Sequence, residues 1–373
     1  MTILAKNQVV VAMSGGVDSS VAALLLKEQG MDVIGVSMKT HDSPESDTAS
    51  AGCSSGKTCC SASDINDARR VCQILDIPFY AMDFRDEFQE KVIQNFAREY
   101  AQGRTPNPCV QCNDKIKFSL LLNRARQLGA YYLATGHYAQ RSRDRNGKYH
   151  LLRSRDRDKD QTYFLFGLGQ EQLEHTLFPI GKYTKEEVRD FARLAGLKTA
   201  DKPESQDICF VKNNDYAGFL ESHPEGNLLK KADPGLYVDQ EGNELGEHRG
   251  IHAYTVGQRK GLGIATGERM YVTEIRPETN QVVLGSKENL LMNGLLANEI
   301  RWINRDNVFS GIEVEIRLRH RHRGVPAVLS LLDDAKVRAD FQTPEGAVTP
   351  GQVAVFYHGE EVLGGGWIEK GLA

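Results

Sequence analysis

Segments typical of strands and of helices alternate along residues 8–200 of the chain. Residues 8–13 form an apolar run typical of a buried strand, and residues 19–29 carry apolar side chains at helical spacing. Further helices are expected at 63–75, 84–102 and 113–128, and further strands at 33–38, 77–82 and 132–135. Helices that join successive strands make the strands parallel and cover both faces of the sheet. The alternation therefore predicts an open parallel α/β sheet with helices on both faces.

Local signals mark the ends of several of these helices. Gly30 and Gly196 follow two helical segments at the position where a left-handed residue commonly ends a helix. Thr184 and Glu187 have the spacing of a capping box, which predicts a helix that starts between them.

The pattern changes after residue 222. Glycine-rich turns separate short alternating strands as far as residue 284, and from 285 onward segments such as VAVFYHGEEVLGGGWIE are typical of antiparallel strands. We therefore expect three domains: an α/β catalytic domain at 1–222, a small central β-rich domain at 223–284, and a C-terminal antiparallel β-barrel at 285–373.

Charge and cysteine content exclude several classes of protein. A net charge of −4 argues against indiscriminate binding to nucleic acid, although segregated basic residues still allow such a partner. The seven cysteines are an odd number. Without a signal sequence, they indicate free thiols, metal ligands or catalytic residues rather than a disulfide framework. No apolar run approaches the roughly 20 residues needed to span a membrane. The opening residues MTILAKNQVVVAM predict the first strand of a cytoplasmic protein.

The stretch SGGVDSS lies where the first strand hands over to the first helix. Glycines let successive backbone N–H groups turn toward an anion, and the start of a helix adds partial positive charge. Ser14 and Ser19 add hydroxyl groups, whereas Asp18 would repel a bare phosphate and is better suited to hold Mg²⁺ bound to that phosphate. The turn therefore predicts a phosphate site, and an ordinary tight βα turn is the alternative.

SGGVDS resembles the PP-loop of N-type ATP pyrophosphatases, which split ATP into AMP and pyrophosphate. The resemblance implies an ATP site that includes Met38 at the end of the second strand and Gly136 further along the chain. The remaining implied ATP-binding residues form the turn itself: Ala12, Met13, Ser14, Gly15, Gly16, Val17, Asp18 and Ser19.

Five further motifs narrow the resemblance. They are RTPNPCVQCNDKIKF (104–118), TGHYA (135–139), KDQTYFL (159–165), SQDICFV (205–211) and YTVGQRKGLGI (254–264). Together they are closely similar to the tRNA-specific 2-thiouridylase (MnmA) family. The resemblance implies ATP- and Mg²⁺-dependent 2-thiolation of the wobble uridine, position 34, in tRNAs for lysine, glutamate and glutamine. It also implies an adenylated uridine, a cysteine persulfide, and a protein that donates persulfide sulfur, either a sulfur relay protein or a cysteine desulfurase.

Two cysteines match the catalytic positions of this family. Cys112 corresponds to the nucleophile and Cys209 to the persulfide carrier. Cys112 lies just before a predicted helix, whose N-terminal field favours thiolate, although Asp114 opposes this effect. Cys109 stands where the family usually has an aspartate. Either another group performs the acid–base role that the aspartate would have in the family, or Cys109, Cys112 and Cys209 hold a [4Fe-4S] cluster with an open iron position.

The other cysteines have simpler interpretations. Cys72 lies on the apolar face of a helix and is expected in the core. Cys53, Cys59 and Cys60 lie in an insertion loop as free thiols or as half of a zinc site.

A tRNA-modifying enzyme must flip its target base into the active site. The family resemblance implies contacts to tRNA from Asn107, Pro108, Cys109, His137, Lys159, Asp160, Gln161, Arg319, His320 and Gln352. If IRLRHRHRG (316–324) is a strand, Arg317, Arg319, Arg321 and Arg323 share one face and form a stripe suited to phosphates. The alternative for this stripe is a charged, solvated edge strand. The C-terminal barrel is then the expected tRNA-binding domain.

Two other functions remain open at this point. One is a different PP-loop tRNA modifier, such as a lysidine synthetase, which needs no paired cysteines. The other is a non-catalytic redox sensor that carries an iron–sulfur cluster and binds tRNA.

Overall fold

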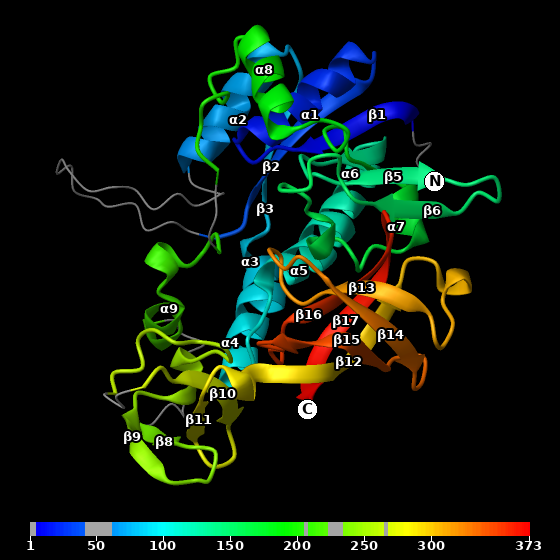
Figure 1. The fold of residues 1–373 in the computed structure, drawn as a ribbon. Helices are drawn as coiled ribbons and strands as arrows, with labels where there is room; N and C mark the ends of the chain where they lie inside the picture. Colours follow the sequence, from blue (N-terminus) through cyan, green and yellow to red (C-terminus); the bar gives the residue numbers. More distant parts are fainter. Residues whose placement is uncertain (1–4, 42–61, 205–207, 223–233, 265–267) are drawn as a thin grey trace, which may run out of the picture. The chain divides into compact units, whose positions relative to one another are not determined.

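The computed structural model describes residues 5–41, 62–204, 208–222, 234–264 and 268–373 (Figure 1). The chain divides into two compact units. The first comprises Met1–Val92 and Cys109–Asn214, and the second comprises Ile93–Pro108 and Asp215–Ala373. Cys53, Cys59 and Cys60, with their possible zinc site, lie outside the described residues.

The first unit is built on a parallel sheet, as the sequence predicts. Its strands are β1 (Ala5–Ala12), β2 (Asp32–Lys39), β3 (Phe79–Asp83), β4 (Ala130–Ala134) and β7 (Thr176–Leu177), in the order β3-β2-β1-β4-β7. Every neighbouring pair is parallel. Val9, Val10 and Val11 of the central strand are all 0 % exposed, so both faces of the sheet are covered.

Helices α1 (Val17–Glu28), α2 (Ala62–Ile74) and α8 (Lys185–Leu194) share one core cluster with Val9 and Val11 of β1. The Sγ of Cys72 lies in this cluster, and burial raises the pKa of its thiol to about 12, as expected for an inert core cysteine. Gly30 and Gly196 have positive φ values of 78° and 67°. The Thr184–Glu187 capping box is present at the start of α8. These local predictions are confirmed.

Two of the expected helices are present but divided into shorter segments, and several further elements were not predicted. The helix expected at 84–102 is split into α3 (Arg85–Phe88), a π-helical turn η1 (Gln89–Ile93) and α4 (Gln94–Ala101), the last in the second unit. The helix expected at 113–128 begins earlier, as α5 (Pro108–Gln111), η2 (Cys112–Leu121) and α6 (Leu122–Gln127). Among the described residues, the first unit also contains a hairpin and three short helical segments. These are β5 (Gln140–Arg143) with β6 (Tyr149–Leu152), η3 (Thr162–Phe164), α7 (Gln170–Glu174) and η4 (Lys212–Asn214).

The second unit holds two β-structures, as the sequence predicts. A small sheet has the order β10 (Tyr271–Arg276), β11 (Gln281–Gly285), β8 (Gly235–Val238) and β9 (Glu244–His248), with η6 (Ile251–Ala253) and α9 (Tyr216–Ser222) beside it. Antiparallel strands then form a barrel in the order β12 (Leu291–Trp302), β15 (Val337–Gly346), β14 (Val325–Leu331), β13 (Glu313–Arg317), β16 (Val353–His358) and β17 (Glu361–Leu372). Pairing of β12 with β17 closes the barrel. Short helical turns η7 (Glu288–Leu290) and η8 (Arg305–Asn307) flank β12. Within the described ranges, every helix is too short or too polar to cross a membrane.

Candidate active site

The turn between β1 and α1 leaves the start of the helix without a side-chain cap. Gly15 has a φ of 71°, and a Cβ at this position would lie 2.3 Å from the carbonyl oxygen of Asp64. Gly16 is the N-cap of α1 and has no side chain that could accept a hydrogen bond from the first turn. The N–H groups at the start of the helix are therefore left to an external acceptor, and an anion is favoured by the helix dipole.

Hydroxyl groups hold the shape of this turn. Ser19 Oγ accepts a hydrogen bond from the N–H of Ser14 at 3.2 Å, and the two Oγ atoms lie 3.3 Å apart. Ser20 Oγ donates to the carbonyl of Gly16 at 2.7 Å. From β2, Ser37 Oγ donates to the carbonyl of Met13 at 2.6 Å. The turn is thus fixed before any ligand arrives, which reduces the entropy lost on binding.

Two residues expected in the nucleotide pocket lie where strands end beside the turn. Met38 is near the end of β2 and pairs with Met82 of β3. Gly136 follows β4, and a Cβ there would lie 2.6 Å from the backbone nitrogen of Ser19. Only glycine allows this close approach between the TGHYA segment and the start of α1.

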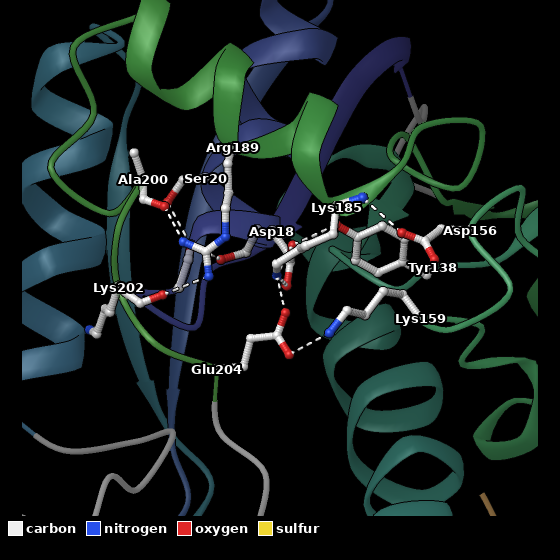
Figure 2. A network of polar contacts seen from close by, with 12 residues as sticks. Asp18, Ser20, Tyr138, Asp156, Lys159, Lys185, Arg189, Ala200, Lys202 and Glu204 are labelled. Carbon is white, nitrogen blue, oxygen red and sulfur yellow. Dashed lines mark hydrogen bonds and ion pairs between the residues drawn. The ribbon is translucent and has the colours of Figure 1, made fainter. Parts of the chain in front are cut away.

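Asp18 belongs to a network of charges at the turn (Figure 2). Both of its carboxylate oxygens accept hydrogen bonds from Lys185 Nζ at 2.8 Å, and Oδ1 also accepts one from the hydroxyl of Tyr138 at 3.0 Å. Glu204 lies 3.0 Å from Lys185 Nζ and 2.8 Å from Lys159 Nζ. The two lysines lower the pKa of Glu204 against the effect of its burial.

A third lysine contacts the turn at Gly15. Lys202 Nζ donates to the carbonyl of Gly15 at 3.0 Å and to the carboxylates of Asp64 and Asp67 at 2.7 Å each. The two carboxylates raise the pKa of Lys202 although burial opposes them. Its three donors are matched by three acceptors, so Lys202 fixes the orientation of the Gly15 peptide.

The donor set of the turn fits a magnesium ion bound to phosphate. Mg²⁺ prefers oxygen ligands and is usually held in proteins by one or two carboxylates. Asp18 and Glu204 supply such carboxylates beside the hydroxyl groups of Ser14 and Ser19.

Cys112 lies in a helix and not ahead of one. Pro108 begins α5, in agreement with the preference for proline in the first turn, and Cys112 follows one turn later as the first residue of η2. The expectation that Cys112 precedes the helix is therefore wrong, and Cys109 occupies the first turn instead. π-Helical geometry such as that of η2 is rare and is common at functional sites. Cys109 is exposed, whereas Cys112 is half-buried.

Cys209 lies in a turn after the parallel sheet and is half-buried. The ring of the next residue, Phe210, packs edge-to-face against Phe88 of α3, with centroids 5.7 Å apart. Helix α3 in turn packs against η2, which starts at Cys112. Cys209 thus directly precedes a residue that packs on α3, and Cys112 is the first residue of the helical segment that α3 contacts.

The three-cysteine cluster is not supported. Across the described parts of the chain, no group of three histidine, cysteine, aspartate or glutamate side chains is placed to hold a metal ion. The placement of Cys109, Cys112 and Cys209 therefore gives no support to an iron–sulfur cluster with an open iron position.

Residues of the TGHYA and KDQTYFL motifs pack against each other. His137 accepts from or donates to Thr135 Oγ1 at 2.8 Å, and burial holds the pKa of its imidazole well below the ordinary value, so the ring is neutral. Gln161 Oε1 accepts a hydrogen bond from the N–H of Tyr138 at 3.0 Å. Asp160 is 2 % exposed and accepts hydrogen bonds from Ser154 and Thr162. A direct contact between Asp160 and tRNA has no support in this geometry.

Three segments that lie far apart in the sequence meet in the second unit. Thr105 Oγ1 donates to Thr255 Oγ1 at 3.2 Å, and its N–H donates to the carbonyl of Pro350 at 2.9 Å. Gln352 Nε2 donates to the carbonyls of Thr105 and Pro106, both at 3.0 Å. Asn107 and Pro108, which follow directly, are buried. The segment that leads into Cys109 is thus held by the loop before β16, and we call these contacts the Thr105 clasp.

The arginine stripe does not form as expected. Strand β13 ends at Arg317, and residues 318–321 form a bend and turn, so the alternation of a strand does not continue. Arg317 is 8 % exposed and lies over the ring of Tyr357 at 5.0 Å. Burial against an aromatic ring in the barrel explains its removal from the surface. Arg319, Arg321 and Arg323 are exposed, and His320 is half-buried.

The sequence interpretation missed Lys185 and Glu204. Lys185 is the first residue of α8, where the helix dipole disfavours a positive charge. That position was the signal that could have found it, because a lysine at such a place indicates an anionic partner. Glu204 had no comparable local signal.

Comparisons with known proteins agree with this architecture. The family model described as the tRNA methyl transferase HUP domain matches residues 7–213. The tRNA methyl transferase PRC-barrel domain matches 226–286, and the aminomethyltransferase beta-barrel domain matches 292–368.

Curated relatives align with the chain over its whole length. A protein of Geobacter metallireducens named tRNA-specific 2-thiouridylase MnmA is 50 % identical over 377 residues, covering 100 % of this chain and 99 % of the relative. A protein of the same name in Geotalea uraniireducens is 51 % identical over 367 residues, covering 98 % of this chain and 96 % of the relative. The chain belongs to the tRNA-specific 2-thiouridylase family.

Proposed function

We propose that this protein is an ATP-dependent tRNA uridine 2-sulfurtransferase that acts in the cytoplasm on the wobble uridine, position 34. The observation that carries the proposal is the glycine-rich turn at Ser14–Ser19, which leads into a helix start without a side-chain cap, in one compact unit with Cys112 and Cys209. A phosphate-binding turn alone would suit many nucleotide enzymes. The two half-buried cysteines of the same unit would add a means of sulfur transfer.

The first step activates the uridine. Its O2 attacks the α-phosphorus of ATP, a bond forms between O2 and phosphorus, and pyrophosphate leaves. The N–H groups at the start of α1 would bind phosphate oxygens, and Asp18 would hold the magnesium ion that neutralises their charge. Activation is needed because oxygen on C2 of uracil is a poor leaving group, whereas AMP is a good one.

The second step transfers sulfur. The terminal sulfur of a persulfide on Cys209 attacks C2 of the activated uridine, and AMP leaves with the former O2. The thiolate of Cys112 then attacks Sγ of Cys209, which forms a Cys112–Cys209 disulfide and releases 2-thiouridine. A thiol reductant reduces the disulfide, and a persulfide-donating protein reloads Cys209.

Other parts of the chain have proposed roles in binding tRNA. We infer that residues 1–222 carry the chemistry, that 223–284 form the central domain, and that the barrel at 285–373 binds tRNA. Proposed contacts include exposed Arg319 and its neighbour His320, and Lys159 beside the turn. The expected substrates are tRNAs for lysine, glutamate and glutamine.

The test separates activation from sulfur transfer. Wild-type protein is incubated with tRNA, ATP, Mg²⁺, a persulfide-donating protein and a thiol reductant, and pyrophosphate release and 2-thiouridine are both measured. Cys209→Ser should release pyrophosphate and form no 2-thiouridine. Cys112→Ser should block turnover, because no thiol is left to resolve the persulfide. Cys109→Ser should retain substantial activity, because the relay needs two cysteines.

Other results would redirect the proposal. Activity that survives the double Cys112→Ser/Cys209→Ser substitution would indicate a modifier of the lysidine-synthetase type. Absence of any tRNA-dependent pyrophosphate release by the wild-type protein would indicate a binding protein and not an enzyme.

A further inference from the structure

Lys185 places a nearly buried positive charge directly beside the phosphate-binding turn. Its side chain is 11 % exposed, and its Nζ lies 2.8 Å from both carboxylate oxygens of Asp18 and 3.0 Å from Glu204 Oε1 (Figure 2). These three oxygens use the full set of donors of one ammonium group.

The base of this side chain is held rigidly. The backbone N–H of Lys185 donates to Asp156 Oδ2 at 2.9 Å, and the preceding residue, Thr184, closes the capping box with Glu187. The ammonium also lies over the ring of Tyr138, 5.7 Å from the centroid. Lys185 is therefore fixed at its backbone, while its four-carbon stem can still redirect the ammonium.

The charges of this group balance. Asp18 and Glu204 supply two negative charges, and Lys185 and Lys159 supply two positive charges through contacts of 2.8–3.0 Å. Lys202 is different, because its contacts with Asp64, Asp67 and the Gly15 carbonyl already use three donors and support the turn. Lys185 differs from Lys202 in that both of its carboxylate partners, Asp18 and Glu204, belong to the set of oxygens that would hold the magnesium ion.

A nucleoside triphosphate changes this balance. Its phosphates bring several negative charges next to Asp18, and a divalent metal bound to them competes for carboxylate oxygens. When the metal takes the carboxylates, the ammonium loses its partners and lies next to uncompensated phosphate oxygens. We propose that Lys185 is a phosphate-binding residue of the ATP site, whose ammonium competes with the divalent metal ion for Asp18 and Glu204 and turns to the phosphates when the metal binds.

The proposal rests on the proposed function only in requiring that the turn binds ATP. It adds Lys185 to the residues that bind the phosphates of ATP, and it predicts two opposite effects from one substitution. Lys185→Gln removes the competitor of the metal and so should strengthen metal binding, but it removes a phosphate contact and so should weaken ATP binding.

The experiment measures both effects on the full chain. Mn²⁺ alone is titrated and its free concentration is followed by electron paramagnetic resonance, where Lys185→Gln should bind Mn²⁺ about tenfold more tightly than wild type. ATP and AMP are titrated calorimetrically at saturating Mg²⁺, where the same variant should lose about tenfold to a hundredfold in ATP affinity and much less in AMP affinity. Lys182→Gln, an exposed lysine three residues away, is the matched control and should behave as wild type.

A second variant guards against general damage to the site. Lys185→Gln leaves Asp18 and Glu204 facing each other, so the double variant Lys185→Gln/Glu204→Gln removes one of the two charges. It should keep the loss of ATP affinity and lose the gain in Mn²⁺ affinity.

Weaker or unchanged Mn²⁺ binding by Lys185→Gln would overturn the proposal, and so would unchanged ATP affinity. Failure of the wild-type protein to bind ATP would overturn the proposed function instead. A purely structural role of Lys185 would weaken metal and nucleotide binding together, an outcome that the proposal forbids.

Discussion

Gln352 offers the sharpest test of how the segment before Cys109 is held. Family resemblance makes this residue a tRNA contact, yet its side-chain amide donates to the carbonyls of Thr105 and Pro106 in the Thr105 clasp. Gln352→Ala removes both hydrogen bonds. We expect the segment 104–108 to open more often, and the effect on tRNA to follow from that opening.

The magnitude follows from the two contacts, each 3.0 Å long. A neutral hydrogen bond contributes a net stabilisation of about 1 kcal/mol, so the pair contributes about 2 kcal/mol. This free energy corresponds to about a thirtyfold rise in the open fraction of the segment. Gln352→Glu should be worse, because a carboxylate oxygen would face the two carbonyl oxygens.

Hydrogen exchange measures this opening directly. The N–H of Thr105 donates to the carbonyl of Pro350, so its exchange should become about thirty times faster in Gln352→Ala. Gln240→Ala is the matched control, since this exposed glutamine also donates through its Nε2, to Thr273 Oγ1 at 2.8 Å in the same unit. Exchange of Thr105 in the control should equal that of wild type.

The opposite pattern would refute the reasoning. If Gln352→Ala weakens tRNA binding while the exchange of Thr105 stays unchanged, the side chain acts on tRNA directly and the clasp contributes little. A loss of turnover with unchanged tRNA affinity would instead agree with misplacement of the segment that leads into Cys109.

Three further predictions concern the turn, the barrel and pH. Gly15→Ala should weaken ATP binding in calorimetry and lower the urea midpoint, because a Cβ would lie 2.3 Å from a carbonyl oxygen and φ is 71°; wild-type values in both would contradict this. Replacing Arg319, Arg321 and Arg323 by glutamine should weaken tRNA binding and reduce the salt slope by about one for every phosphate that is no longer bound, whereas Arg317→Gln should mainly lower stability; equal salt slopes would return these arginines to a solvated surface. Burial keeps the pKa of His137 below its unfolded value, so the unfolded chain binds more protons and the free energy of unfolding falls as the pH drops through about 6.5. His137→Gln should make urea midpoints at about pH 7.5 and pH 5.5 more alike, and an undiminished difference would exclude this residue as the cause.

Local signals predicted the parts of the fold that local physics determines. The run Val9–Val11 is buried on both faces because it is the middle strand of a parallel sheet. Thr184 and Glu187 formed the expected box because their hydrogen bonds span three residues. Cys72 was recognised as a core residue because helical periodicity places it on the apolar face.

Predictions failed where a single position outweighed the periodic pattern. Pro108 starts its helix earlier than the apolar periodicity indicates, and this moves Cys112 one turn inside. Alternation along residues 316–324 places Arg317 in an exposed stripe. The strand ends at Arg317, however, and its guanidinium packs on the ring of Tyr357. Alternation in the sequence cannot reveal where a strand ends when the next residues continue to alternate.

Contacts between distant residues were beyond the reach of local patterns. Gln352 and Thr105 are 247 positions apart, and Lys185 and Asp18 are 167 apart. Each residue carries an ordinary signal at its own place, and only the fold brings the pairs together. Sequence motifs identified these segments as important without indicating that they hold one another.

The boundary between the two compact units falls directly after the residues that the Thr105 clasp holds, between Pro108 and Cys109. Residues 93–108 group with the β-rich unit, whereas Cys109 and Cys112 group with the α/β unit. Thr255 of the TVGQRKG motif and Gln352 of the barrel loop both contact Thr105, and the chain then runs through buried Asn107 and Pro108 into α5. Within the β-rich unit, these contacts hold the backbone of the segment that directly precedes Cys109. We therefore expect Thr255→Ala, like Gln352→Ala, to make the exchange of the Thr105 N–H faster, and an unchanged exchange rate would show that Thr255 does not help to hold this segment.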